Sequence, residues 1–370
     1  EISACLVGSE MCIRDRIFTG LVGIIDPPKE NVDKSIAACK KAGIKVRMIT
    51  GDHLKTAASI AREIGILTDG KVIDGETLDK LSDEEYFEMV DDIQVYARVK
   101  PEQKMRIVET LKQKGEIVSM TGDGVNDAPA LKNASIGVAM GSGTDVAKES
   151  GDMIIQDDNF ETIVTAIREG RKIYDNIKRF VKFQVSTNVG AILTIVGTSI
   201  FMLPVPFNPV QLLWINIVMD GPPAQTLGME GSERNIMTRQ PETGDILNKK
   251  VLIKIFIAGL VMAIGSIALF SYKLAIGASQ KQAMTVAFTL FVMYQLFNAY
   301  NSKSNSAKKS TYLYLAIIAC FILQVLIVYI PELQIIFRTT SIGLTDWILI
   351  FIIAATILVS NRIANKIVVE

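Results

Sequence analysis

The sequence predicts an α/β domain built on a mostly parallel sheet, followed by an all-α domain of about six transmembrane helices. Residues 17–182 carry charged side chains throughout, and short apolar runs alternate there with helix-like patterns, as strands alternate with crossover helices in a parallel sheet. Residues 183–219 contain no charged side chain, and this stretch is longer than the roughly 20 residues that span a bilayer. We therefore expect a soluble half and a membrane half.

The bulk composition argues against several other classes of protein. The 39 basic side chains balance the 39 acidic ones, so no net positive charge indicates a nucleic-acid partner. The 4 cysteines form no CxxC pair and have no neighbouring histidine, so neither a zinc site nor a disulfide framework is expected. Residues 1–16 resemble translated sequencing-adapter read-through or an unplaced terminus, and we expect them to lie outside the fold.

The soluble domain is expected to occupy residues 17–170. Its strands are predicted from apolar runs that end in turns, and its helices from apolar residues at helical spacing followed by a glycine. The predicted strands are residues 18–26, 44–50, 94–99, 116–120 and 136–140, and the predicted helices are residues 31–43, 54–65, 102–115 and 128–134. The acid-rich stretch 69–92 is expected to be a solvated surface loop with a short helix.

The membrane domain is expected to occupy residues 171–370. Pro204 and Pro206 divide the long uncharged stretch into two spans, and further apolar runs follow. The six predicted spans are about residues 180–203, 208–228, 251–273, 283–302, 311–331 and 343–363. Three segments carry positive charge: Lys249 and Lys250, the linker 301–310, and the carboxyl end. By the positive-inside rule, we expect these segments on the cytoplasmic side, together with the soluble domain.

Acidic residues follow three of the predicted strands, at the point where each strand ends. They are Asp26, Asp52 in "MITGD", and Asp123 and Asp127 in "TGDGVND". Because the carboxyl ends of parallel strands line one crevice, these side chains and Thr50 are expected to converge. Crowded carboxylates repel one another unless a cation lies among them, and Mg²⁺ typically binds one or two carboxylates together with phosphate oxygens.

Three further groups fit the same chemistry. Lys104 would place a positive charge beside a transferring phosphoryl group, and the Thr50 hydroxyl with the Gly51 amide would supply hydrogen-bond donors. A single "TGD" is common turn chemistry. The three turns together, in this order and with a lysine between the last two, are more specific and predict a phosphoryl-transfer site.

The strings "DPPK", "TGDHLKTA", "ARVKPEQK" and "TGDGVNDAPALK" resemble the phosphorylation domain of P-type cation-transporting ATPases, which belong to the haloacid-dehalogenase-like superfamily. The resemblance covers residues 17–370, including the membrane half. It implies a Rossmann-like parallel sheet, with Mg²⁺ and ATP as cofactors. It also implies that Asp123 and Asp127 hold Mg²⁺ and that Asn126 belongs to the same turn.

The same resemblance implies roles for the other turn residues. The threonine matching Thr50 contacts the phosphoryl group, and the lysine matching Lys104 stabilises it. The residues matching Asp52 and Arg98 are associated with nucleotide handling.

The sequence departs from the family in one respect. The family's nucleophile is the aspartate of "DKTGT", and no such string occurs. The nearest approximation, Asp33-Lys34-Ser35, lies inside a predicted helix. The chain therefore resembles the carboxy-terminal portion of a pump with an incomplete phosphorylation domain, and we expect that it neither forms an acyl phosphate nor hydrolyses ATP by itself.

Polar residues in the first two predicted spans indicate an ion site. An aspartate near the bilayer centre costs about 2.5–3.5 kcal/mol on insertion scales, so Asp220 marks an ion pathway. Asn216 precedes Asp220 by four residues and is expected to share its helical face, and the Gly221-Pro222-Pro223 string would free carbonyl oxygens. With Asn188 they would form a cation site. Alternatively, Asn188 and Asn216 only join helices by hydrogen bonds.

The stretches "STNVGAIL" and "QLLWINIVMDGPPAQTLG" resemble calcium pumps, most closely their secretory-pathway and bacterial relatives. Two-site calcium pumps have acidic or hydroxyl groups where Ala191, Met219 and Asn305 stand here, which leaves one site. The resemblance implies Ca²⁺ as the transported cation, with Mn²⁺ next, further ligands from a fourth helix that this sequence lacks, and a monomer when complete.

Other interpretations stay open at this point. The chain could be a membrane-anchored phosphatase of the same superfamily, or a non-catalytic membrane protein that regulates a pump. A pump could also carry Na⁺, K⁺ or H⁺. Short loops and the absence of an organellar extension favour a bacterial plasma membrane.

Overall fold

The computed structural model describes residues 27–242, 244–304 and 310–369. These residues form two compact units, one built mainly from residues 47–139 and 143–153, and the other mainly from residue 154 onward. The predicted strand 18–26 and its Asp26 lie outside the described residues.

The strands form two sheets with the orders β1-β3-β2 and β4-β5-β6, in which β1 and β2 pair in parallel with β3, and β4 pairs in parallel with β5. The predicted parallel α/β architecture is therefore confirmed, although the strands divide into two sheets of three. The strands are β1 (Met48–Ile49), β2 (Lys71–Asp74), β3 (Ile93–Ala97), β4 (Ser119–Gly122), β5 (Ile136–Met140) and β6 (Met153–Ile155).

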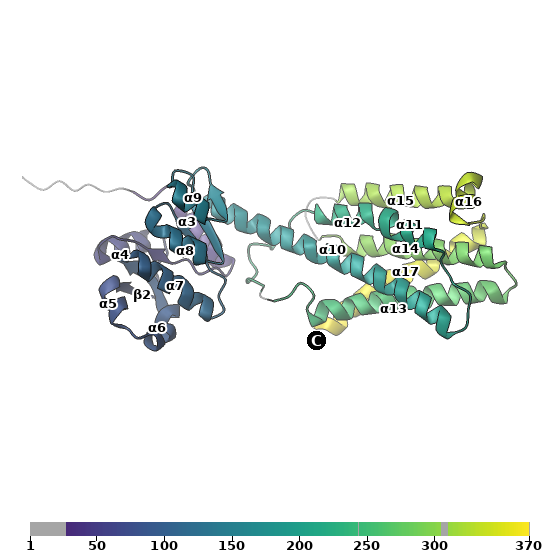
Figure 1. Cartoon of the computed structure of the whole chain (residues 1–370), viewed down its shortest axis with the longest axis horizontal. Helices are drawn as coiled ribbons and strands as arrows, with labels where there is room; N and C mark the ends of the chain where they lie inside the picture. The colour runs from purple at the N-terminus through teal and green to yellow at the C-terminus, as the bar shows by residue number, and fades with distance from the viewer. Residues whose placement is uncertain (1–26, 243, 305–309, 370) are drawn as a thin grey trace, which may run out of the picture. The chain divides into compact units, whose positions relative to one another are not determined.

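Helices connect these strands as the apolar periodicity predicts (Figure 1). In α7, Ile107, Val108 and Leu111 lie on one face and are buried against the sheets. The helices are α3 (Val32–Lys41), α4 (Leu54–Glu63), α5 (Gly75–Lys80), α6 (Asp83–Met89), α7 (Pro101–Gln113), α8 (Ala128–Asn133) and α9 (Asp145–Ser150).

The prediction that residues 69–92 form a solvated loop with one short helix is wrong. They form strand β2 and the two helices α5 and α6, and Leu78 and Tyr86 are fully buried. The acidic residues that suggested a loop instead stabilise the start of α6. Ser82 and Glu85 form a capping box there, and acidic side chains in a first turn interact favourably with the helix dipole.

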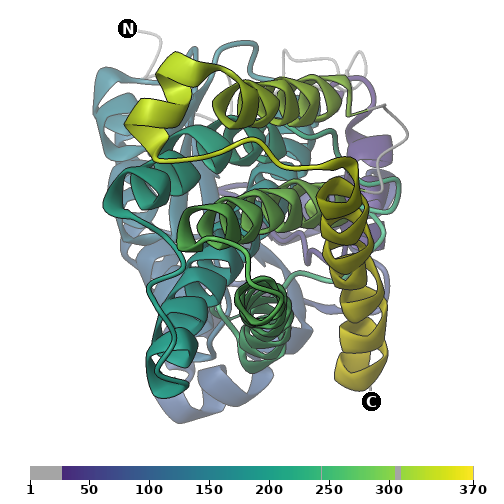
Figure 2. The ribbon, with the colours of Figure 1, turned by 90° about the vertical axis from the view of Figure 1, so that its right-hand side faces the viewer.

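The membrane unit is a helical bundle. Among its described residues, 4 helices are long and apolar enough to cross a membrane: α10 (Phe160–Ile200), α13 (Lys249–Ala275), α14 (Gln280–Ser302) and α15 (Thr311–Tyr329). In α14, 83% of the most apolar stretch is buried, against 28–33% in the other three. The helix α14 contacts α10, α13 and α15 as well as α12 (Gly221–Gly228) and α17 (Leu344–Val369), so it is the centre of the bundle (Figure 2).

The two other predicted spans take different forms. Residues 208–228 are divided into α11 (Pro209–Trp214), a π-helical turn (Ile215–Met219) and α12 (Gly221–Gly228). The last predicted span lies in α17 (Leu344–Val369), whose apolar part, Leu344–Ser360, is shorter than the other candidates, and the short α16 (Pro331–Phe337) precedes it. The span predicted from residue 180 begins earlier, because α10 is one continuous helix of 41 residues.

The loop between α12 and α13 is fastened to the first half of α10 by charged groups. The Arg171 guanidinium donates to the carbonyl oxygens of Ile236 and Arg239, at 2.9 Å each. Three ion pairs add to this network: Arg179–Glu233 at 2.5 Å, Lys178–Glu242 at 2.6 Å and Arg239–Asp175 at 2.7 Å. The hydrogen bond from Lys178 holds the pKa of Glu242 below its usual value.

Candidate functional site

The "TGDGVND" loop begins where β4 ends and folds around the carboxylate of Asp127. One oxygen of this buried carboxylate accepts a hydrogen bond from Lys104 Nζ at 2.5 Å. The other oxygen accepts the backbone N–H groups of Asp123 and Gly124, at 3.3 Å each. Lys104 comes from α7, so the ion pair joins this helix to the loop that follows β4.

A glycine is required at the end of β4. A Cβ atom added at Gly122 would overlap the Cβ and Cγ atoms of Asp127. At Gly124 the nearest atom to an added Cβ would be Asp127 Oδ2, at an ordinary 3.7 Å. The first glycine of the loop therefore lets the backbone approach the buried carboxylate closely, whereas the second is not required by packing.

Asp123 and Asn126 lie on the accessible side of the same loop. Both residues are exposed, and the backbone of Asp123 is fixed because its carbonyl oxygen accepts the Thr144 N–H at 2.8 Å. An exposed carboxylate on a fixed backbone fits a Mg²⁺ ligand, because this ion usually binds through one or two carboxylates and keeps several waters. Both oxygens of Asp127, in contrast, already accept hydrogen bonds, so its geometry fits a residue that orients Lys104.

Thr50, Gly51, Asp52 and Arg98 form a second group, at the carboxyl ends of β1 and β3. The Arg98 N–H donates to the Asp52 carbonyl oxygen at 3.0 Å, and the Thr50 hydroxyl oxygen accepts the Asp52 N–H at 3.1 Å. Arg98 has a φ of 49°, in the left-handed region that non-glycine residues rarely adopt. Backbone strain of this kind is typical of functional sites, and the side chains of Asp52 and Arg98 are exposed there.

The structure thus places the predicted residues in two groups on the soluble unit. Ile49 and Val118, which precede the two loops in sequence, pack against two hydrophobic clusters of described residues. Among the described residues, no hydrogen bond or ion pair joins the Thr50 group to the Asp127 group. The two groups are held by a common core, not by direct contact.

In the membrane unit, Asp220 is fully buried and hydrogen bonded by three neutral side chains. Its Oδ2 accepts the Thr187 hydroxyl at 3.0 Å and Gln184 Nε2 at 3.3 Å. Its Oδ1 accepts Gln295 Nε2 at 2.8 Å. Thr187 and Gln184 lie on α10 and Gln295 lies on α14, so the carboxylate ties together three segments of the bundle.

The other two predicted cation ligands have different surroundings. Asn188 is half-buried, and Asn216 is exposed, although Asp220 four residues later is fully buried. The expected shared face assumed an α-helix. Residues Ile215–Met219 instead form a π-helical turn, in which the Asp220 N–H donates to the Ile215 carbonyl oxygen. Asn305, where two-site pumps have an acidic group, lies outside the described residues.

The sequence analysis missed Gln295. The signal was present, because Gln295 and Asn298 are polar residues three positions apart within the apolar helix α14, and so lie on one face. Asn298 Nδ2 donates to the Ser186 hydroxyl oxygen at 2.8 Å, one turn along from the Asp220 cluster. Within the described ranges there is no group of three or more His, Cys, Asp or Glu residues that could hold a metal ion. A cation at Asp220 would therefore be bound by mixed carboxylate, amide, hydroxyl and carbonyl oxygens.

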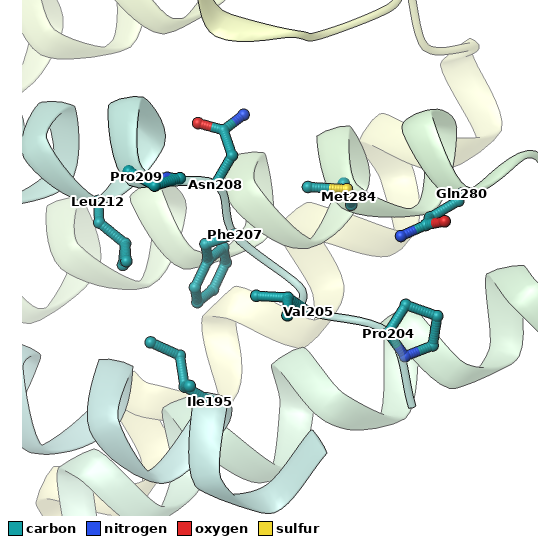
Figure 3. A pocket seen from close by; sticks show the side chains of 9 residues that line it. All are labelled: Ile195, Pro204, Val205, Phe207, Asn208, Pro209, Leu212, Gln280 and Met284. Carbon is teal, nitrogen blue, oxygen red and sulfur yellow. The ribbon is translucent and has the colours of Figure 1, made fainter. Parts of the chain in front are cut away.

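A pocket of about 540 Å³ lies in the membrane unit, beside the connection from α10 to α11 (Figure 3). None of the predicted site residues lines it. The lining residues are Ile195, Pro204, Val205, Phe207, Asn208, Pro209, Leu212, Gln280 and Met284. Its largely apolar lining offers no cluster of cation ligands.

Comparison with known proteins yields two family models and several similar curated proteins. Residues 204–367 match the carboxy-terminal domain of cation transporting ATPases, and residues 11–135 match haloacid dehalogenase-like hydrolases. A calcium-transporting ATPase of Bacillus subtilis is 41% identical over 92% of this chain and 40% of the relative. Calcium-transporting ATPase 1 of Saccharomyces cerevisiae is 40% identical over 96% of the chain and 39% of the relative.

A third relative, the human calcium-transporting ATPase type 2C member 1, is 38% identical over 95% of the chain and 39% of its own length. The chain thus spans about two fifths of the length of the curated relatives that it matches.

Proposed function

Because the chain belongs to the P-type cation-transporting ATPases, we propose that it forms the carboxy-terminal part of an ATP-driven pump that exports Ca²⁺. The chain is an integral membrane protein. The match to a cation-transporter model extends over most of the membrane half, which disfavours a phosphatase with simple membrane anchors. The sequence contains no "DKTGT" string, and on its own the chain is proposed to form no acyl phosphate.

The observation that carries the choice of cation is the environment of Asp220. This carboxylate is fully buried, and all its hydrogen-bond partners are neutral. A buried carboxylate without a cationic partner is unfavourable unless a cation binds it or it takes up a proton. Hard oxygen ligands of mixed charge suit Ca²⁺, and Mn²⁺ is the competing divalent ion.

We propose that Asp220, Asn188 and Asn216 bind the transported cation. The exposed side of Asn216 and the half-buried Asn188 leave room for ligands from a further helix of a whole pump. The alternative, in which the two asparagines only join helices, is not supported by hydrogen bonds, since neither side chain donates or accepts one among the described residues.

In the soluble unit, we propose that the two groups of residues act on opposite sides of a phosphoryl group. Asp123 and Asp127 would hold Mg²⁺, which neutralises developing charge on the phosphoryl oxygens when it is bound. Asp127 orients Lys104, whose ammonium group stabilises the phosphoryl oxygens, and Asn126 completes the loop. Thr50 and the Gly51 amide donate hydrogen bonds to the same group.

Asp52 and Arg98 are proposed to contact ATP. The hydrogen bond from the Arg98 N–H to the Asp52 carbonyl oxygen holds their backbones together, and both side chains are exposed. The partners of a whole pump would be ATP, Ca²⁺ or Mn²⁺ and the lipid bilayer. We propose a monomer in a bacterial plasma membrane.

The proposal is tested by ATP-driven uptake of ⁴⁵Ca²⁺ into vesicles. The protein tested is this chain completed with the amino-terminal part of the Bacillus subtilis relative. We expect uptake that Mn²⁺ inhibits, that Asp220→Asn abolishes, and that Asp123→Ala lowers at least a hundredfold. Uptake that persists in Asp220→Asn would refute the cation site. A pump that moves Na⁺, K⁺ or H⁺ but not Ca²⁺ would refute the proposed substrate.

A further inference from the structure

A cluster of lysines lies where α10 and α13 enter their uncharged stretches. Its members are Lys178 and Lys182 on α10, and Lys249, Lys250 and Lys254 on α13. The two helices lie side by side in the membrane unit (Figure 1), and residues 183–219 and 255–272, which follow these lysines, contain no charged side chain. The positive charge of Lys254 is repelled by those of Lys178, Lys182 and Lys250, so the cluster spans both helices.

Most of this positive charge is not balanced within the described part of the chain. Lys178 forms an ion pair with Glu242 at 2.6 Å. In contrast, no ion pair or hydrogen bond joins the side chain of Lys249, Lys250 or Lys254 to another described group. The first turn of α13 also contains no acidic residue, although a cation at a helix N-terminus is unfavourable because the helix dipole is positive there. The cluster therefore favours an anion from outside the chain.

An exposed apolar stripe continues from the lysines along α13. Ile253, Phe256, Leu260 and Ile264 are exposed and follow one another at intervals of three or four residues, so they share one helical face. Lys249 precedes Ile253 by four residues and begins this stripe. Because α13 is a candidate membrane span, the stripe faces an apolar environment. A molecule that fits both parts has a negatively charged head and an apolar tail.

The length of the cluster matches the headgroup layer of a bilayer. Lys249 and Lys254 are separated by about 7–8 Å along the helix axis. The headgroup layer is about 5–8 Å thick on each side of the hydrocarbon core. Lysine side chains also extend along apolar surfaces and place their ammonium groups among the headgroups. The ammonium groups of Lys250 and Lys254 would thus reach the phosphates of neighbouring lipids.

We propose that this lysine cluster binds the headgroup of an anionic phospholipid, whose acyl chains pack on the apolar stripe of α13. The net charge of the cluster selects an anionic headgroup over a zwitterionic one. The bound lipid would relieve the repulsion between α10 and α13 and so stabilise their packing. The inference goes beyond the proposed function, because it needs only the membrane location of the two helices and is independent of the transported cation.

The test is a titration of short-chain phosphatidylglycerol into the purified 370-residue chain in an uncharged detergent, followed by native mass spectrometry and by thermal unfolding. We expect phosphatidylglycerol to bind at least tenfold more tightly than phosphatidylcholine, to raise the unfolding temperature, and to bind less tightly as salt is added. Combined Lys249→Gln, Lys250→Gln and Lys254→Gln should lower the affinity at least tenfold. The corresponding three arginine substitutions should keep the affinity within threefold of the unsubstituted chain.

A matched control removes the same net charge elsewhere. Lys41, Lys80 and Lys132 are exposed, and replacing all three by glutamine should change the affinity for phosphatidylglycerol less than twofold. An equal loss of affinity in this control would overturn the inference, because net charge alone would then explain binding. The unfolding temperatures of the two glutamine variants without lipid should match that of the unsubstituted chain, which separates lost binding from lost folding.

Three other outcomes would also overturn the inference. Equal affinity for phosphatidylglycerol and phosphatidylcholine would show that the cluster does not select charge. Inorganic phosphate that competes at the same concentration as the lipid would show a site for free anions that makes no use of the apolar stripe. Loss of the lipid preference in the chain completed with the amino-terminal part of the Bacillus subtilis relative would show that another helix covers the stripe.

Discussion

The two units each bury an aspartate that belongs to a proposed site, and they surround its carboxylate in different ways. In the soluble unit, Asp127 receives an ammonium group from Lys104 and two backbone N–H groups. In the membrane unit, the described residues offer Asp220 one alcohol and two amides, from Thr187, Gln184 and Gln295. The first carboxylate is balanced within the chain. The second has polar contacts but no balancing charge, which is the condition of a site that binds an external cation.

The membrane unit does balance other buried charges. Lys273, near the end of α13, forms an ion pair with Asp346 in the first turn of α17, and both side chains are buried. This bundle therefore does pair a buried aspartate with a buried lysine elsewhere. Its absence from the hydrogen-bond partners of Asp220 supports a role in binding.

The largest expected effect follows from removing the cation that balances Asp127. Lys104→Ala should lower the free energy of unfolding of the soluble unit by about 3 kcal/mol, because a buried carboxylate loses its only charged partner. Thermal unfolding and hydrogen exchange of the loop after β4 measure this effect.

Lys100→Ala is the control for that experiment. Its ion pair with Asp79 is 3.6 Å long and largely exposed, so its loss should cost less than about 0.5 kcal/mol. Equal losses in the free energy of unfolding for Lys104→Ala and Lys100→Ala would contradict the expectation that the buried ion pair of Asp127 stabilises the soluble unit more than the exposed pair does.

A smaller effect is expected from crowding Asp127. Gly122→Ala should lower the free energy of unfolding by about 1–3 kcal/mol, because the added methyl overlaps the Asp127 side chain and must displace it from Lys104. Gly124→Ala has room for its methyl and should cost less than about 1 kcal/mol. Chemical denaturation of both variants measures these free energies of unfolding. A larger loss of stability in Gly124→Ala than in Gly122→Ala would contradict the close packing of Gly122 against Asp127.

The soluble unit also buries two neutral tyrosines, Tyr86 and Tyr96, and their ionisation should lower its free energy of unfolding. Burial, followed by the nearby Tyr96, raises the pKa of Tyr86 above its usual value, and the two hydroxyl groups are 3.0 Å apart. The pKa of Tyr96 is raised as well, mainly by burial. A raised pKa on a neutral acid means that stability is complete below the unfolded value of about 10 and is lost as the pH rises above it.

We therefore expect the soluble unit to unfold in alkali, beginning above about pH 10. Tyr86→Phe should move this alkaline transition to higher pH, as followed by circular dichroism. A transition that does not move would mean that other groups control the alkaline limit.

The smallest effect on stability is expected at Asp220 in cation-free buffer. Asp220→Asn removes a buried charge, and rotation of the Gln295 amide can pair its unpartnered oxygen with the new Nδ2, so the free energy of unfolding should change by less than about 1 kcal/mol. Asp127→Asn should cost about 3 kcal/mol, because it leaves Lys104 without its partner. Similar losses in the free energy of unfolding for Asp220→Asn and Asp127→Asn would contradict the difference that we infer between the two carboxylates.

The sequence predicted the elements whose signal is local. Strand-turn strings identified the loops of Thr50 and Asp127, and apolar periodicity identified helices such as α4 and α7. It did not identify the ion pair between Lys104 and Asp127, because the partners lie 23 positions apart and only the packing of α7 brings them together.

Two further features were not predicted from the sequence. The acidic residues of segment 69–92 suggested solvent exposure, whereas the segment is anchored by the fully buried Leu78 and Tyr86. Nearly every side chain of α14 is buried, so apolar periodicity could not distinguish one face of this helix from another. The contact between Gln295 and Asp220 became evident only in the structure.

The π-helical turn before Asp220 contains one residue more than an α-helical turn would. A turn of this kind holds more residues than an α-turn, and each residue of an α-helix advances the chain by about 100°. Tightening Ile215–Met219 to α geometry would therefore rotate everything after it by about that angle. The Asp220 carboxylate would then leave the position in which Thr187, Gln184 and Gln295 contact it.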